Sequence, residues 1–253
     1  MMRRFSLLFV LLTACAATRE LAQVEDTADP TAPAGAQARH AAPARWLEVS
    51  PYGFEALAAD IGTEDAAQLW TDEALQEFAH ALEAQDQSSV RAAVLCGRSR
   101  DPRAAEVLIA RLEQRVLGPD RNSDAGDVVA AAGLAGWLEQ DGLADRLAAL
   151  ASGDAPHPDL EVRAECAASA LRLGAPTESV APFMLTLLRA LTPEEREHPA
   201  DWPRQRTVAW AKSRAAEALS ERAGIPCSFR PDGSFAHQAE ETAKLERALE
   251  LSD

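Results

Sequence analysis

Alanine and leucine dominate this sequence, and their excess limits the folds that the chain can adopt. The 253 residues include 54 Ala and 30 Leu, whereas Val and Ile together number 15. Ala and Leu lose little conformational entropy in a helix, while residues that favour strands are too scarce to build a large sheet. The length allows one ordinary domain, or two small ones, with a sizeable core. We therefore expect an all-α protein.

The charge balance restricts the possible partners. The chain has 25 Lys and Arg against 40 Asp and Glu, which gives a formal net charge of −15. Nucleic-acid binding depends largely on contacts between basic side chains and phosphates, so we expect no nucleic-acid partner. Anionic lipid headgroups would also repel such a chain. Any attachment to a membrane must therefore come from something other than a basic face.

The N-terminus has the features of an export signal. Arg3 and Arg4 precede an apolar run from Phe5 to Ala14. This run is too short to cross a bilayer core about 30 Å thick, but it fits the apolar region of a secretory signal. We therefore predict a signal peptide over residues 1–14. The two arginines leave a twin-arginine signal as a weaker alternative.

The end of this segment, Leu12-Thr13-Ala14-Cys15, resembles the lipobox of bacterial lipoproteins. The resemblance covers four residues and implies that Cys15 is lipidated, with the acyl chains as the only membrane anchor. In proteobacterial lipoproteins an alanine after the cysteine, here Ala16, usually implies sorting to the outer membrane. The resemblance thus implies a cell-envelope protein that faces the periplasm. Ordinary signal cleavage beside Cys15 is the alternative, and it would give a soluble product.

The stretch after Cys15 differs in composition from the rest of the chain. Residues 16–45 are rich in Ala, Thr, Pro, Asp and Gln and show no apolar periodicity. Such a segment buries too little surface to offset its ordering entropy. We therefore predict a lipidated cysteine with a flexible linker over residues 15–45, followed by a helical domain over residues 46–253.

Helical pairs recur within the predicted domain. One pair covers residues 88–117, with Ser88 or Ser89 capping its first helix and Asp101-Pro102 starting its second. A second pair covers residues 159–191, and residues 127–150 form a degenerate copy between them, with Leu134 and Leu138 in the apolar stripe of its first helix. Val90-Arg91 and Val162-Arg163 are 72 residues apart, which is twice 36. Paired helices with a period in the thirties are typical of a solenoid.

The phrases Asp86-Gln87-Ser88-Ser89-Val90-Arg91 and Asp159-Leu160-Glu161-Val162-Arg163 resemble HEAT-like repeats, as does Asp101-Pro102-Arg103-Ala104 at the start of a second helix. The resemblance covers roughly residues 86–222. It implies an α/α superhelix, a short right-handed solenoid of four to five helical hairpins that binds proteins rather than catalysing a reaction. Tetratricopeptide repeats have a similar period and remain the rival, although their small and aromatic positions are not met in series.

Further helices are expected at both ends of these repeats. One begins at Thr71, another runs from Pro203 to Gly224, and a last one carries Leu245. Residues 231–234 read as a turn, or as the tip of a small hairpin.

The sequence contains none of the usual catalytic, phosphate-binding or metal-binding motifs, so we predict no catalytic residue, cofactor or metal site. Cys96 and Cys166 lie two repeats apart, too far for a disulfide, and are expected to be buried. Cys227 is expected to be buried beneath the last helix, with a free thiol or an intermolecular partner as the alternative. Trp137 and Trp210 read more readily as core residues than as surface residues.

The first hypothesis for function is a scaffold that binds another envelope protein. Arg91, Arg163 and Trp202 are the candidate partner-surface residues. The two arginines occupy equivalent positions, where structural pairing with acids such as Asp86 and Asp159 is the favoured alternative. The second hypothesis is an envelope hydrolase or metal-dependent enzyme on a helical frame. It predicts a pocket in which one of three histidines meets carboxylates: His157, His198 or His237.

Overall fold

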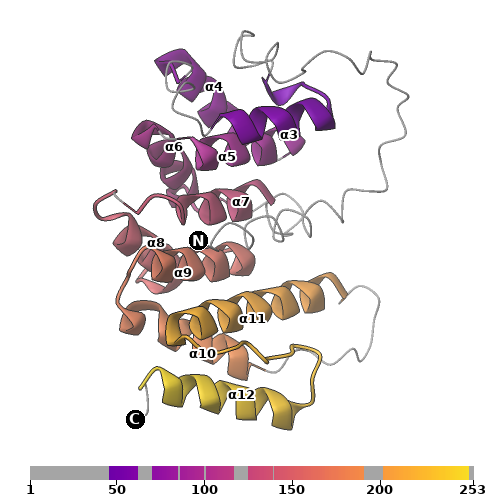
Figure 1. Cartoon of the computed structure of the whole chain (residues 1–253), viewed down its shortest axis with the longest axis vertical. Helices are drawn as coiled ribbons and strands as arrows, with labels where there is room; N and C mark the ends of the chain where they lie inside the picture. Colours follow the sequence, from indigo (N-terminus) through magenta and orange to yellow (C-terminus); the bar gives the residue numbers. More distant parts are fainter. Residues whose placement is uncertain are drawn as a thin grey trace. The chain divides into compact units, whose positions relative to one another are not determined.

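The structure is a computed structural model that describes residues 46–61, 70–84, 86–99, 101–116, 125–138, 140–190 and 202–250. These residues belong to one compact unit, residues 35–253. The predicted signal peptide, the linker and Cys15 lie outside them. The described segments form ten α-helices and contain no β-strand, which confirms the all-α prediction (Figure 1). None of these helices is both long enough and apolar enough to cross a bilayer.

The helices are α3 (Pro51–Asp60), α4 (Asp72–Glu83), α5 (Gln87–Arg98), α6 (Pro102–Glu113), α7 (Ala125–Leu134), α8 (Leu143–Ser152), α9 (Leu160–Arg172), α10 (Thr177–Arg189), α11 (Trp202–Ala223) and α12 (Phe235–Ala248).

Three of the helices begin at an aspartate that accepts hydrogen bonds from the first turn. Asp101 accepts from the backbone N–H of Arg103 at 2.9 Å, and Asp159 caps α9 in the same way. Asp86 caps α5 by accepting from the N–H of Ser88 at 2.7 Å. The α5 cap is therefore Asp86 rather than Ser88 or Ser89. A carboxylate at this position satisfies free amide groups and also interacts favourably with the helix dipole.

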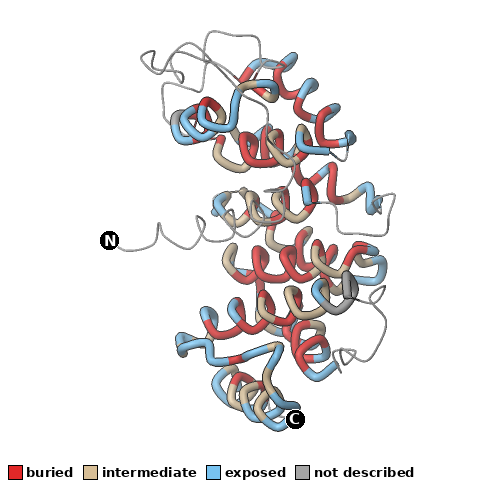
Figure 2. The backbone as a smooth tube through the Cα atoms, turned by 90° about the vertical axis from the view of Figure 1, so that its right-hand side faces the viewer, coloured by how far each residue is buried: buried red, intermediate tan, exposed pale blue. Residues whose placement is uncertain are grey.

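The helices pack in two layers. In one layer α3, α5, α7, α9 and α11 contact one another in this order, and in the other α4, α6, α8, α10 and α12 do the same (Figure 1). Most helices also contact their neighbour in sequence across the two layers. Buried residues accordingly gather on the facing sides of the helices, whereas exposed residues lie on the outer turns (Figure 2).

Small residues bring some helices into unusually close contact. A Cβ atom added to Gly97 of α5 would lie 2.8 Å from the Cα atom of Gly133 in α7. This distance is shorter than real Cβ contacts, so the two backbones touch at this crossing. Buried alanines occupy much of the remaining space between the layers, which explains the composition of the chain.

Aromatic side chains fill the core beside the first helices. Trp46, Trp70 and Phe78 are all buried, with ring centroids 5.3 to 6.3 Å apart. At the C-terminal end of the chain, α12 buries only Thr242 and Leu245. Apart from Phe235, which is 66 % exposed at its first position, its other side chains are polar or small, so it covers α10 and α11 without exposing a broad apolar face.

Two local predictions require correction. The predicted apolar stripe of the degenerate pair includes Leu138, but α7 ends at Leu134 and Leu138 is 70 % exposed. The chain turns at residues 135–138, beside Gly136, so the helical spacing no longer applies. The predicted turn at residues 231–234 is confirmed, but the described residues on either side form no strands, so it is not the tip of a hairpin, and Ser234 ends it by capping α12.

Candidate functional site

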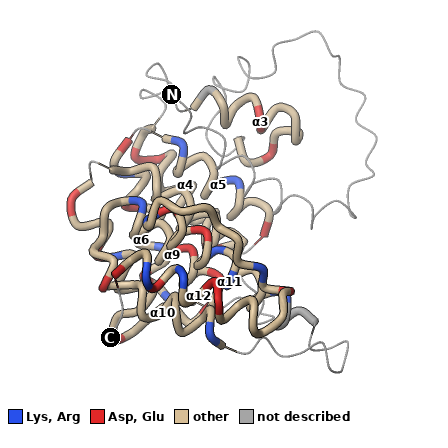
Figure 3. Tube along the Cα trace, turned by 60° about the horizontal axis from the view of Figure 1, so that its bottom comes forward, with Lys and Arg blue, Asp and Glu red and all other residues tan. Residues whose placement is uncertain are grey.

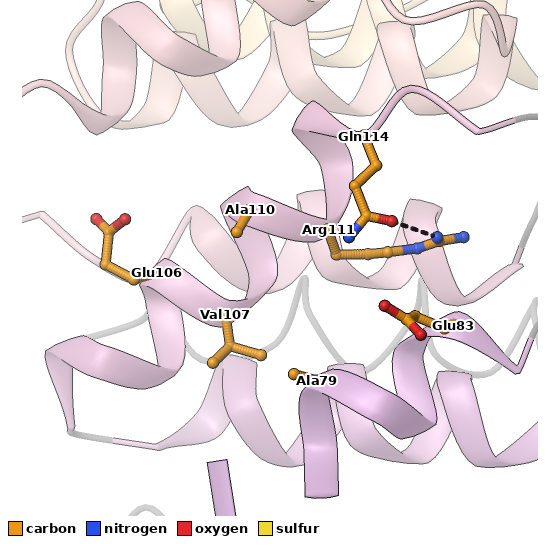
Figure 4. Close-up of a pocket in the computed structure, with 7 residues that line it drawn as sticks. All are labelled: Ala79, Glu83, Glu106, Val107, Ala110, Arg111 and Gln114. Atoms are coloured by element: carbon orange, nitrogen blue, oxygen red, sulfur yellow. Dashed lines mark hydrogen bonds between the residues drawn. The ribbon is translucent and has the colours of Figure 1, made fainter. Parts of the chain in front are cut away.

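A groove lies at the surface between α4 and α6. Its volume is about 270 Å³, and it lies along one side of the pair (Figure 4). Helix α4 contributes Ala79 and Glu83. The remaining lining residues come from α6 and the residue that follows it: Glu106, Val107, Ala110, Arg111 and Gln114.

Helical periodicity explains why the floor of this groove is apolar and accessible. Helix α4 turns Leu75, Phe78 and Leu82 into the core, and α6 does the same with its own leucines. Ala79, Val107 and Ala110 fall outside these buried stripes and keep contact with solvent. The floor is therefore an exposed strip of small aliphatic side chains between two helices.

Carboxylates lie at both ends of the groove (Figure 4). Glu83 is 57 % exposed, and its Oε2 lies 3.9 Å from Nδ1 of the His80 imidazole. Glu106 is 52 % exposed and forms an ion pair with Arg146 of α8, with 2.9 Å between Nη1 and Oε2. Arg146 also binds Glu113 at 2.8 Å, which lowers the pKa of that carboxyl through hydrogen bonding and attraction. This clamp fastens α8 to α6.

The aliphatic part of the Arg111 side chain lines the groove, whereas its guanidinium group pairs with Asp127 of α7. Its Nε donates to Asp127 of α7 at 2.9 Å, and Nη1 donates to Gln114 at 3.2 Å (Figure 4). The Arg111 and Asp127 side chains are 5 % and 1 % exposed, so this ion pair is buried. It ties the back of the groove to the next helix.

A histidine lies buried between α8 and α9. His157 Nδ1 accepts the backbone N–H of Asp159 at 3.1 Å, which requires the neutral tautomer with its proton on Nε2. Nε2 is buried and has no hydrogen-bond partner among the residues that the structure describes. Burial lowers the pKa of His157 below its ordinary value of 6.5, and Arg111 and Arg115 lower it further, whereas Asp159 opposes the shift.

This burial predicts that mild acid destabilises the fold. Because the unfolded chain takes up the histidine proton first, the stabilisation is complete above pH 6.5 and declines as the pH falls below it. Urea unfolding of the wild-type chain at pH 7.5 and 5.0 should show this loss. In His157→Gln the loss should be clearly smaller, whereas replacing exposed His80 by Gln should leave it intact. Equal losses in wild type and His157→Gln would contradict the prediction.

A second buried ion pair joins α9 to α11. Arg214 Nη2 donates to Glu165 Oε1 at 2.7 Å, and Nε donates to the other oxygen. The two side chains are 4 % and 0 % exposed. Burial disfavours the charged guanidinium, but Glu165 more than compensates and raises the pKa of Arg214. Nearby, Lys212 is also buried, and its Nζ donates to Gln238 of α12 at 3.0 Å.

The predicted partner-surface residues Arg91 and Arg163 each contact a backbone carbonyl and an aromatic ring, but on different elements of the fold. Arg91 Nη1 donates to the carbonyl oxygens of Leu47 and Val49 at 2.6 and 2.8 Å, and its guanidinium lies 5.0 Å from the Phe54 ring centroid. Both arginines are half-buried, and burial lowers the pKa of each.

Arg163 Nε donates to the Ala151 carbonyl at 2.8 Å, and its guanidinium lies 4.3 Å from the Phe183 ring centroid. The contacts that position both arginines are therefore carbonyls and rings, which fasten neighbouring segments together. Their part in partner binding stays a prediction.

Other predicted residues are placed as follows. The side chain of Trp202, at the start of α11, lies outside the described part of the structure, as does His198. Trp137 and Trp210 are partly buried. His237 Nε2 lies 3.1 Å from the Ser228 carbonyl oxygen.

The cysteines behave differently from one another. Cys96 and Cys166 are buried free thiols, as predicted, and burial raises the pKa of both. Cys227 is exposed, so the prediction of a buried position is wrong. Phe229 takes the buried place in this loop instead.

Comparison of the chain with protein-family models, with curated proteins and with solved structures found no significant match. No group of three His, Cys, Asp or Glu side chains suited to hold a metal ion occurs within the described ranges. The sequence did not predict the groove. Its floor consists of Ala79, Val107 and Ala110, which do not belong to the buried apolar stripes of α4 and α6. The one sequence signal nearby is α4, which contains four acids and no Lys or Arg.

Proposed function

We propose that this chain is a lipid-anchored scaffold of the bacterial cell envelope, which faces the periplasm and presents its helices to another envelope protein. In this proposal the anchor is an acylated Cys15, and the membrane is the outer one. The helical domain is a HEAT-like right-handed solenoid.

The observation that carries this proposal is the order of helix contacts. Each layer runs through the domain helix by helix, and most successive helices also contact each other across the layers. A single helical pair buries too little apolar surface to be stable, so each pair depends on its neighbours, as in repeat proteins. Repeat domains of this kind commonly serve as binding surfaces for proteins.

Crosslinking in native membranes tests this function. With formaldehyde as the short crosslinker, the wild-type chain should sediment with membranes and yield a reproducible protein adduct. The Cys15→Ala variant should lose the acyl mass from its mature N-terminus, appear in the soluble fraction and lose most of the adduct. Recovery of monomer alone across several crosslinker lengths would contradict the scaffold. An unmodified Cys15 in the mass spectrum of the exported wild-type chain would contradict the anchor.

A further inference from the structure

We propose that the groove between α4 and α6 binds a Lys- or Arg-rich segment of the partner protein, which inserts one aliphatic side chain between the two helices. This inference rests on the proposed protein-binding function and names the chemistry of the partner.

The size and lining of the groove favour a single inserted side chain. Small-molecule sites usually enclose about 300–1,000 Å³ and bury most of their ligand. At about 270 Å³ this groove is smaller, and it lies open at the surface. Its floor of Ala79, Val107 and Ala110 offers apolar contact but no convergent set of polar groups. Such a surface suits an aliphatic anchor on a larger partner, as at the centres of protein interfaces.

The charged residues around the floor of the groove favour a partner segment with positive charge. Glu83 and Glu106 lie at opposite ends of the groove and keep about half of their surface exposed. Arg146 pairs with both Glu106 and Glu113, so these three side chains together keep one negative charge, and Glu83 adds a second. The Arg111 charge is held by Asp127 behind the groove, and α4 contributes no Lys or Arg. A basic segment would therefore meet complementary charges, whereas an acidic one would be repelled.

The net charge also argues against a second copy of the chain as the occupant. Two copies that each carry −15 repel each other at long range. Acidic and basic residues both occur along the described helices (Figure 3), so the sign of the groove is a local property. A foreign basic segment fits both the local and the overall charge.

Two labelled synthetic peptides test the inference on the full mature chain. The first is an amphipathic helix of Lys and Leu, and the second has Glu in place of every Lys. Fluorescence anisotropy should show that the Lys peptide binds and that the Glu peptide binds at least about tenfold more weakly. Binding of the Lys peptide should also weaken as salt is added. Equal binding of the two peptides would overturn the inference.

Matched variants locate the binding surface. Ala79→Leu and Ala110→Leu place a side chain in the groove and should each weaken binding of the Lys peptide by about tenfold. Ala149→Leu, on the exposed face of α8, is the control and should leave binding unchanged. Circular dichroism establishes that each variant is folded. Unchanged binding by both folded groove variants would overturn the inference.

A second pair of variants separates the groove from the general negative charge. Glu83→Gln should weaken binding severalfold, whereas Glu240→Gln, an exposed position on α12, should have little effect although it removes the same charge. Equal losses would show attraction to the whole chain and would overturn the inference. A concentration-dependent dimer that Ala110→Leu disrupts would also overturn it, by assigning the groove to a second copy.

The membrane experiment distinguishes this inference from the proposed function. If the adduct in native membranes persists in Ala79→Leu and Ala110→Leu, the proposed role of the groove is refuted, whereas the proposed scaffold function is not. If the wild-type chain gives no adduct, the scaffold itself fails.

Discussion

Replacing Arg214 by Met should lower the free energy of unfolding by about 3–5 kcal/mol, because it leaves the Glu165 carboxylate buried without its partner. Glu165 is 0 % exposed and receives two hydrogen bonds from the guanidinium, which joins α9 to α11. Methionine occupies a similar volume, so the loss reports the charge more than the packing. Urea unfolding followed by circular dichroism at neutral pH measures the change.

The double variant Glu165→Leu with Arg214→Met provides the control. Since an apolar pair removes both buried charges, its stability should lie much closer to that of the wild type than to that of Arg214→Met. The two substitutions are therefore expected to be strongly non-additive. A single variant as stable as the wild type would show that Glu165 does not depend on Arg214 in the folded chain.

Replacing Gly97 by Leu should destabilise the chain by about 1–3 kcal/mol or more, because α5 and α7 have no room for a side chain at their crossing. Even a Cβ atom on Gly97 would approach the Gly133 backbone to 2.8 Å, and backbone atoms cannot move aside as a flexible side chain can. Thermal unfolding of the variant should show a clearly lower midpoint.

Gly136→Ala is the matched control for that substitution. A Cβ atom at Gly136 would lie 3.6 Å from its nearest neighbour, the Gly133 carbonyl oxygen, which is ordinary contact. This variant should keep a midpoint close to that of the wild type. Equal midpoints for Gly97→Leu and Gly136→Ala would mean that α5 and α7 do not meet as closely as described.

The sequence predicted helices best where a capping residue and an apolar stripe agree. Asp101-Pro102 marked the start of α6, and the apolar residues that follow it at helical spacing, Leu108, Ile109 and Leu112, are fully buried. Both signals are local, because a cap acts within one turn and a stripe repeats every three to four residues. The same reasoning failed at Leu138, where the chain turns before the stripe is complete.

The candidate site could not be predicted from local sequence patterns, because it depends on contacts between residues far apart in the sequence. The groove forms because Ala79 and Val107, on different helices, come to lie on facing edges. The Glu165–Arg214 pair joins residues 49 positions apart, and forty acids with twenty-three arginines allow many such pairs. Cys227 and Phe229 lie in one short loop, and only packing against neighbouring helices decides which of them is buried.

The burial of Lys212 has a practical consequence for handling this protein. The chain has only two lysines, and the other, Lys244 on α12, keeps 42 % of its side chain exposed. Amine-reactive dyes or beads should therefore couple to the folded domain mainly at α12, near its C-terminal end. Chains immobilised through Lys244 would share one orientation, and α4, at the opposite end of the series of helix contacts, would be free to bind a ligand in solution.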